Sequence, residues 1–345
     1  MFQPTKPARR SRARSGIALG LAAAATAAAA SACSGGSAGL GSPDQSNVRV
    51  GVVESIGAVP FNIGTSQSSH AFVDAGLTIT VQNFTSESDE LAALASGKID
   101  IAFGQYAEFL NSHSQLAAND NLRVVSEAYD AASGTIGLLT RSGATLPSWG
   151  PGNAFNCNGS DTIVVPSIDS TEYLALASWF QSLGAPLPTS CPAIHVEADP
   201  AKATADVAGG GSIAAALQEP YVTGAEISAG LQETQDLATG NAAAVPVDGY
   251  FATKTFVDKY PHTTAIFAAV MARLQATSGQ RVVIETALRT AGQPDPKVIS
   301  AMQVGTYPTV VLPAKLDIVL RLMNNAGTVS GMLDSAKLTD LTPTT

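Results

Sequence analysis

Cysteine, histidine and tryptophan are scarce in this chain of 345 residues, which contains three cysteines, four histidines and two tryptophans. The histidines make no two-residue metal-binding pattern, and none adjoins a nucleophile motif. They are His70, His113, His195 and His262. The sequence also lacks a phosphate loop and a dinucleotide fingerprint. We therefore expect no metal and no cofactor, and these absences disfavour an enzyme.

Basic residues are fewer than acidic ones. The chain has 19 Lys and Arg against 28 Asp and Glu, which gives a net charge of −9 at pH 7. An acidic protein repels the phosphate backbone of nucleic acids and anionic lipid headgroups. We expect no nucleic-acid partner, and any attachment to a membrane would have to be covalent.

The N-terminal segment has the pattern of a secretory signal. A basic, acid-free start precedes an uncharged and mostly alanine run over residues 16–32. This run is short and only mildly apolar beside the ~20 strongly apolar residues of a spanning helix. We predict that residues 1–33 are a signal peptide. Arg9-Arg10 leaves open whether export uses the general or the twin-arginine route.

The end of this segment resembles the lipobox of bacterial lipoproteins. Small residues, Ala30-Ser31-Ala32, stand directly before Cys33. The resemblance implies that Cys33 is acylated and anchors the protein on the extracytoplasmic face of the cell membrane. The usual Leu at the position of Ala30 is missing, so ordinary cleavage and release is the alternative.

Residues 34–46 are rich in Gly and Ser and predict a flexible tether. Two further cysteines, Cys157 and Cys191, lie in the body of the chain. In an exported protein such a pair more often forms a disulfide than stays free, so we predict one. Two buried thiols are the alternative. A metal-binding pair is disfavoured, because no His or further Cys lies at metal-ligand spacing.

Strands and helices alternate along the body, which predicts an α/β fold with mostly parallel sheets. In the first half, Ser86 and Ser88 are candidate N-caps and Gly97 a natural stop for one helix, while Asp169 and Glu172 suggest a capping box for another. Expected strands are residues 48–53, 77–81, 99–103, 123–128, 134–141, 161–166, 194–197, 235–238 and 249–253. Expected helices are residues 61–74, 86–97, 170–183, 201–208, 213–218, 261–279, 296–303 and 315–325.

Three blocks of sequence resemble one known family. They are Val48–Pro60, Leu91–Gly104 and Pro246–Pro261, and Gln218-Glu219-Pro220 fits the same pattern. The chain resembles the nitrate, sulfonate and taurine class of ABC substrate-binding proteins. The resemblance implies a type II periplasmic-binding-protein fold, with two lobes, two crossover strands and a ligand cleft between the lobes. Lobe 1 would comprise residues 47–136 and 250–345, and lobe 2 residues 137–249.

Ligands collect at the carboxyl ends of the strands in such sheets. Glycines there let backbone approach a ligand, and hydroxyls, amides and helix-start N–H groups can hold it. Ordinary turns, hinge positions and, for Tyr106, packing into the lobe are the alternatives. The candidates from these loops are Ser55, Ile56, Gly104, Gln105, Tyr106, Ser133, Gly134, Ser170 and Thr171.

Acidic and phenolic side chains add a second group of candidates, Glu219, Tyr221, Asp248 and Tyr250. A buried carboxylate needs a partner, which a ligand cation or hydrogen-bond donor would supply. The candidate ligand loops at the strand ends contain no Arg, Lys or His, which disfavours a doubly charged oxyanion. A sulfonate, an organic acid and a nitrogen-containing compound all remain open as the ligand.

Together these observations predict a monomeric, lipid-anchored solute-binding protein that delivers a small organic molecule to an ABC permease. The alternative is an exported enzyme of the same fold that acts on a small heterocycle, because catalytic triads form in space and not in sequence.

Overall fold

The computed structural model describes residues 41–111, 114–159, 161–188, 191–292, 294–329 and 333–343. The predicted signal peptide, Cys33 and the first part of the predicted tether lie outside these residues. The last part of that tether is hydrogen-bonded to the body. Asp44 Oδ2 accepts from the His262 backbone N–H at 2.8 Å, and the Gln45 N–H donates to Thr263 Oγ1 at 2.9 Å.

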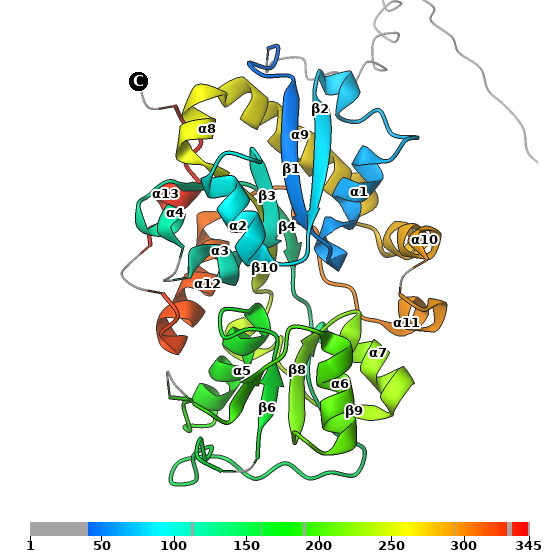
Figure 1. The fold of residues 1–345 in the computed structure, drawn as a ribbon, viewed down its shortest axis with the longest axis vertical. Coiled ribbons are helices and arrows are strands. Elements are labelled where there is room, and N and C mark those ends of the chain that lie inside the picture. The colour runs from blue at the N-terminus through cyan, green and yellow to red at the C-terminus, as the bar shows by residue number, and fades with distance from the viewer. Residues whose placement is uncertain are drawn as a thin grey trace, which may run out of the picture. The chain divides into compact units, whose positions relative to one another are not determined.

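Within the described residues, ten strands form two five-stranded mixed sheets (Figure 1). The first sheet comprises β1 (Asn47–Val53), β2 (Thr78–Phe84), β3 (Ile101–Gln105), β4 (Leu122–Asp130) and β10 (Pro246–Thr253). Its order is β2-β1-β3-β10-β4. Strands β2 and β3 run parallel to β1, whereas β10 runs antiparallel to both its neighbours.

The second sheet repeats this arrangement. It comprises β5 (Ile136–Arg141), β6 (Ile163–Val165), β7 (Ile194–Val196), β8 (Ala214–Gln218) and β9 (Leu231–Asp236), in the order β7-β6-β8-β5-β9. The chain passes to this sheet between β4 and β5 and returns between β9 and β10. We call the part built on the first sheet the first lobe and the part built on the second sheet the second lobe.

Helices cover the sheets and fill the connections (Figure 1). Those in the first half are α1 (Val59–Thr65), α2 (Glu87–Ala95), α3 (Tyr106–Leu110), α4 (Gln115–Ala118), α5 (Thr171–Ser182) and α6 (Pro200–Gly209). The later ones are α7 (Tyr221–Ala229), α8 (Lys254–Lys259), α9 (Pro261–Ser278), α10 (Arg281–Ala291), α11 (Pro296–Ala301), α12 (Pro313–Ala326) and α13 (Ser335–Leu338). Short 3-10 turns lie at Ile56–Ala58, Val73–Ala75 and Gly240–Ala242.

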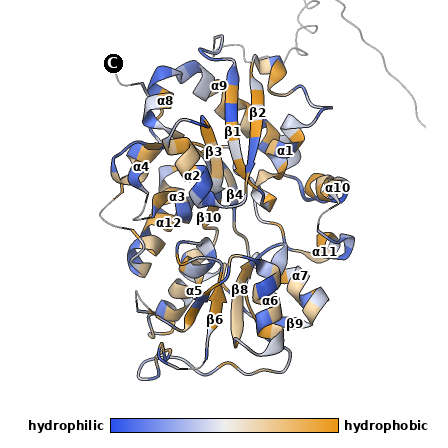
Figure 2. Cartoon of the chain, in the orientation of Figure 1, coloured by the Kyte–Doolittle hydropathy of each residue, from blue (hydrophilic) through white to orange (hydrophobic). Residues whose placement is uncertain are grey.

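The core lies on the strands and on the helix faces that pack against them. Val48, Val50 and Val52 of β1 are fully buried, as expected for a pleated strand whose alternate side chains face the core. Strands β3 and β6 are mainly hydrophobic in Figure 2. Helix α12 packs on α5 of the second lobe as well as on β10, so the C-terminal part of the chain contacts both lobes.

One of the predicted helices is wrong, and another is longer than the helix observed. Of residues 213–218, Ala214–Gln218 form strand β8 instead, because all five residues of this strand are buried between the neighbouring strands β5 and β6, and this packing overrides the helix propensity of alanine. The helix expected over residues 61–74 is shorter, and α1 ends at Thr65. Helix α5 is capped by Ser170 and not by Asp169, since Ser170 Oγ accepts from the Tyr173 N–H at 3.2 Å.

The predicted disulfide is present and joins Cys157 to Cys191. It connects the loop between β5 and β6 to the segment that precedes β7. Among the described residues, no helix has both the length and the apolar character needed to cross a membrane.

Candidate functional site

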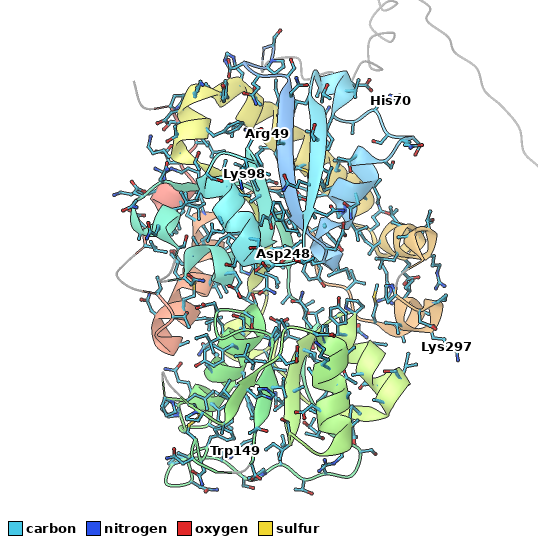
Figure 3. The ribbon with its side chains drawn as sticks, in the orientation of Figure 1. Arg49, His70, Lys98, Trp149, Asp248 and Lys297 are labelled. Carbon is cyan, nitrogen blue, oxygen red and sulfur yellow. A yellow bond between two sulfur atoms is a disulfide. The ribbon has the colours of Figure 1, made fainter. Side chains whose placement is uncertain are left out.

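Ser55, Asp248 and Gln105 meet at the edge of the first sheet that faces the second lobe. Ser55 lies two residues after β1, and its Oγ donates to Asp248 Oδ2 at 2.9 Å while accepting from the Gly57 N–H at 3.1 Å. Asp248 pairs in register with Gln105, the last residue of β3. Figure 3 shows Asp248 at this edge. Three residues that the sequence predicted separately are thus brought together by three different segments.

The second lobe reaches this group through the start of α5. The Thr171 N–H donates to Gln105 Oε1 at 2.8 Å. Ser170 caps the same helix, so its hydroxyl is already used within the second lobe. Backbone N–H groups at a helix start carry partial positive charge, which suits a carbonyl acceptor such as the Gln105 amide. We call Ser55, Gln105, Ser170, Thr171 and Asp248 the interlobe network.

Carboxyl groups from both lobes surround the network. Asp248 is 1% exposed, and burial raises its pKa to about 7, against a smaller opposing effect of the Ser55 hydrogen bond. Glu172, in the first turn of α5, is 4% exposed and burial raises its pKa to about 7. The two charges also repel each other, which contributes to the raised pKa of Asp248.

Two further acids of the first lobe extend this cluster. The Gln105 N–H donates to Glu87 Oε1 at 2.8 Å. Burial first, and the charge of Glu108 second, raise the pKa of Glu87 well above its ordinary value. Burial also raises the pKa of Glu108, and a hydrogen bond with Ser167 of the second lobe opposes that effect. These acids were missed in the sequence because they lie on helix first turns, where acids are common caps.

Glu219 links the lobes at a second place. It is 2% exposed, and its Oε1 accepts from Thr223 Oγ1 at 2.7 Å and from the Gln303 N–H, in the segment after α11, at 3.0 Å. Its Oε2 accepts from the Thr223 N–H at 3.1 Å. Burial raises the pKa of Glu219, and these bonds oppose the rise. The partner that the sequence expected from a ligand is therefore supplied by the protein itself.

The three tyrosines predicted to contact a ligand lie in different surroundings. Tyr106 and Tyr250 are fully buried in the first lobe, where Tyr106 packs edge-on against Phe251 and Tyr250 packs against Phe103. Tyr221 is 47% exposed at the start of α7. Core packing is the observed role of the two buried rings, and their contact with a ligand stays a prediction.

The remaining candidates lie at turns and at the crossing between lobes. Ile56 and Gly104 are buried beside the interlobe network. Ser133 Oγ donates to Asp236 Oδ2 at 2.6 Å, next to the crossing from β4 to β5. Gly134 has a φ of +77°, a backbone conformation that residues other than glycine rarely adopt. These contacts fit the hinge interpretation of Ser133 and Gly134. The described residues contain no group of three or more His, Cys, Asp or Glu suited to a metal ion.

Comparison with known proteins gives a match in structure and none in sequence. No protein-family model and no curated protein matches the chain. The periplasmic aliphatic sulphonate binding protein SsuA from Escherichia coli aligns with a TM-score of 0.63 at 18% identity, over 87% of this chain and 93% of that chain. The alkanesulfonate-binding protein SsuA from Xanthomonas axonopodis pv. citri, bound to MOPS, aligns with a TM-score of 0.65 at 13% identity, over 86% and 98%.

This chain has the periplasmic-binding-protein fold. The periplasmic nitrate-binding protein NrtA from Synechocystis is a further match, with a TM-score of 0.56 at 16% identity, over 72% of this chain and 66% of that chain. Sulfonate- and nitrate-binding proteins are the class that the sequence blocks resemble. The two-lobed periplasmic-binding-protein fold predicted from the sequence is confirmed.

Proposed function

We propose that the protein is an extracytoplasmic solute-binding lipoprotein, which captures a small organic molecule and delivers it to an ABC permease. The observation that carries this proposal is the interlobe network, in which Gln105 of the first lobe accepts from Thr171 of the second beside the buried Asp248. A solute held there would contact both lobes and favour their approach. The solved structures of the same fold include binding components of ABC import systems, which supports the transport role.

The surrounding charges favour a ligand with nitrogen donors. Asp248 and Glu172 are both buried, and no basic side chain takes part in the described hydrogen bonds of the network. A sulfonate or carboxylate placed beside these acids would add like charge to a desolvated site. An amine, amidine or aminopyrimidine would instead donate to the carboxylates and compensate their charge. We therefore favour a nitrogen-containing solute over a sulfonate or an organic acid.

The location rests on the N-terminal sequence. Residues 1–33 would direct export, Cys33 would carry the lipid, and the following Gly- and Ser-rich residues would hold the protein near its permease. We propose that the mature protein is a monomer anchored on the outer face of the cell membrane. Metabolic labelling with a palmitate analogue tests this, because a Cys33→Ser variant would no longer take up the label.

Thermal stability of the full chain in the presence of candidate solutes tests the ligand class. Matched sets of amines, amidines and aminopyrimidines would be compared with sulfonates, nitrate and organic acids. A solute that binds the folded state raises the unfolding temperature in a saturable way. We expect this response from the nitrogen-containing set alone.

Variants then place the site. Thr171→Ala keeps the backbone N–H that donates to Gln105 and is therefore a mild probe of the second lobe. Asp248→Asn removes a charge from the first lobe. We expect Asp248→Asn to weaken the binding of a cationic solute at least about tenfold. Asp317→Asn, an exposed acid on α12, is the matched control. Chemical conversion of a bound solute would indicate an enzyme, and a response to sulfonates alone would contradict the ligand class.

A further inference from the structure

A pocket lies in the second lobe, away from the interlobe network. It has a volume of about 440 Å³, which is in the range of small-molecule sites. Trp149 and Trp179 line it, and they are the only tryptophans of the chain. Trp179 lies near the end of α5 and Thr171 at its start, so about 12 Å of helix separates the pocket from the network. Figure 3 shows Trp149 and Asp248 well apart.

The wall that carries Trp149 is fixed in place. It belongs to the loop between β5 and β6, whose described residues form no helix or strand. Loops of this length within a compact domain are uncommon and are usually functional. The Cys157–Cys191 disulfide ties the loop down, and the Trp149 ring packs against the buried Phe155 and Phe180 with centroids 5.7 and 4.9 Å away. The pocket is therefore preorganised, which lowers the entropic cost of binding.

The lining of the pocket contains no ionisable side chain. A charged ligand would lose hydration there without gaining an ionic partner, so the chemistry favours an uncharged one. Hydroxyl and amide groups are nevertheless present. Thr145, Ser148, Thr234 and Gln235 contribute them. Gln235 Nε2 donates to the Asp236 carbonyl at 2.8 Å, and the amide also has a carbonyl oxygen that can accept a hydrogen bond.

The two indoles provide the apolar surface. Their ring planes are inclined by 87° and their centroids lie 5.9 Å apart, so they form two differently oriented walls. Each indole also has an N–H donor at one edge of an otherwise apolar ring. In the described part of the chain, neither N–H has a hydrogen-bond acceptor among the protein groups.

We propose that this pocket binds a sugar. A sugar ring is uncharged, presents apolar C–H groups that stack on an indole, and carries hydroxyls that both donate and accept. Each of these properties has a counterpart in the lining, with tryptophan for the C–H face and hydroxyl, amide and indole N–H groups for the rim. The site is separate from the interlobe network, and it does not depend on which solute that network holds.

Intrinsic tryptophan fluorescence of the full chain tests this proposal, because both tryptophans line the pocket. The probes are glucose, N-acetylglucosamine and trehalose, with glucosamine and glucuronate as charged analogues of similar size. We expect a saturable change with at least one uncharged sugar at millimolar concentrations. The charged analogues should bind about tenfold more weakly, because their charge has no partner.

Two variants distinguish this site from any other. Thr145→Ala and Gln235→Ala should each weaken sugar binding about fivefold or more, with circular dichroism unchanged. Thr171→Ala, at the other end of α5, should leave sugar binding unchanged. The proposal is overturned if none of the three uncharged sugars gives a saturable response, if glucosamine binds as well as N-acetylglucosamine, or if both pocket variants bind normally.

Discussion

Replacing Asp248 by Asn should stabilise the ligand-free protein at neutral pH. Asp248 is 1% exposed, and the Ser55 hydroxyl is the group that the structure shows donating to its carboxylate. Asparagine has nearly the same shape and keeps an oxygen that can accept this bond. The substitution thus removes the buried charge with little change in packing.

The size of the effect follows from the pKa. Burial raises the pKa of Asp248 from 3.8 to about 7 in the folded protein. Below pH 3.8 the group is protonated in both states and does not affect stability. Between pH 3.8 and about 7 only the folded state keeps the proton, so stability falls as the pH rises. Above pH 7 the accumulated cost is about 4 kcal/mol, and the Asn variant avoids it.

Urea unfolding of both proteins between pH 4 and pH 8 measures this cost, with Asp317→Asn as the control for an exposed acid. We expect the free energy of unfolding of Asp248→Asn to be close to that of the natural protein near pH 4. It should exceed the natural value by up to about 4 kcal/mol at pH 8. A difference between the two proteins that stays constant across this range would refute the reasoning, because a buried titrating carboxyl must produce a slope.

Three other changes test the rest of the structure. Lys315→Met removes the ammonium group that lies 2.8 Å from the carboxylate of the buried Asp130. Urea unfolding should show that the free energy of unfolding falls by about 3 kcal/mol at pH 8. The loss should be smaller at pH 5, because burial raises the pKa of Asp130 and the carboxyl then takes up a proton more readily. Serine at both Cys157 and Cys191 should lower the free energy of unfolding by about 3 kcal/mol in a thermal or urea melt, since the bond closes a span of 34 residues. Ser86→Ala removes the cap of α2 and should cost about 1 kcal/mol by the same measurement; no change would contradict that cap.

Local signals predicted much of the fold. The cap of α2 and the valines of β1 are properties of short stretches: Ser86, one of the two candidate caps, caps the helix, and β1 lies where the sequence placed a strand. Pro261 and Gly279 bracket α9 as expected, because proline suits a first helical turn and glycine commonly follows a last one. The alternation of strands and helices then predicted the α/β fold, and the resemblance of the three sequence blocks implied the two lobes.

Elements whose state depends on distant neighbours could not be predicted in this way. Strand β8 has the sequence Ala-Ala-Ala-Leu-Gln, which favours a helix when considered alone. It is a strand because β5 and β6 pair with it on either side, and those strands are far away in sequence. Helices α7 and α10 were also missed: each begins three residues after the preceding element ends, and neither has a side chain that caps its start.

The candidate site shows the same division. Ser55 lies two residues after β1, Gln105 ends β3, and Thr171 begins the helix after β6, so the rule that ligand groups gather at strand ends was enough to select them. Whether the other candidate side chains can contact a ligand depends on their burial, and burial depends on which face of an element meets the other lobe. Tyr106 follows Gln105 by one residue, yet its ring lies in the core against Phe251. Sequence adjacency could not separate these two side chains.

The arrangement of acids suggests how a solute would control the approach of the two lobes. Asp248 belongs to the first lobe and Glu172 to the second, and their charges raise the pKa of Asp248 in addition to the effect of burial. When both are ionised they repel across the interface, which favours separation of the lobes. A cationic solute between them would replace that repulsion by two attractions, and would thereby shift the population toward the arrangement in which Gln105 meets Thr171. A neutral solute would not replace this repulsion by attraction. Under the proposed function, the response to ligand charge should therefore be strongest above pH 7, where both carboxyls are ionised.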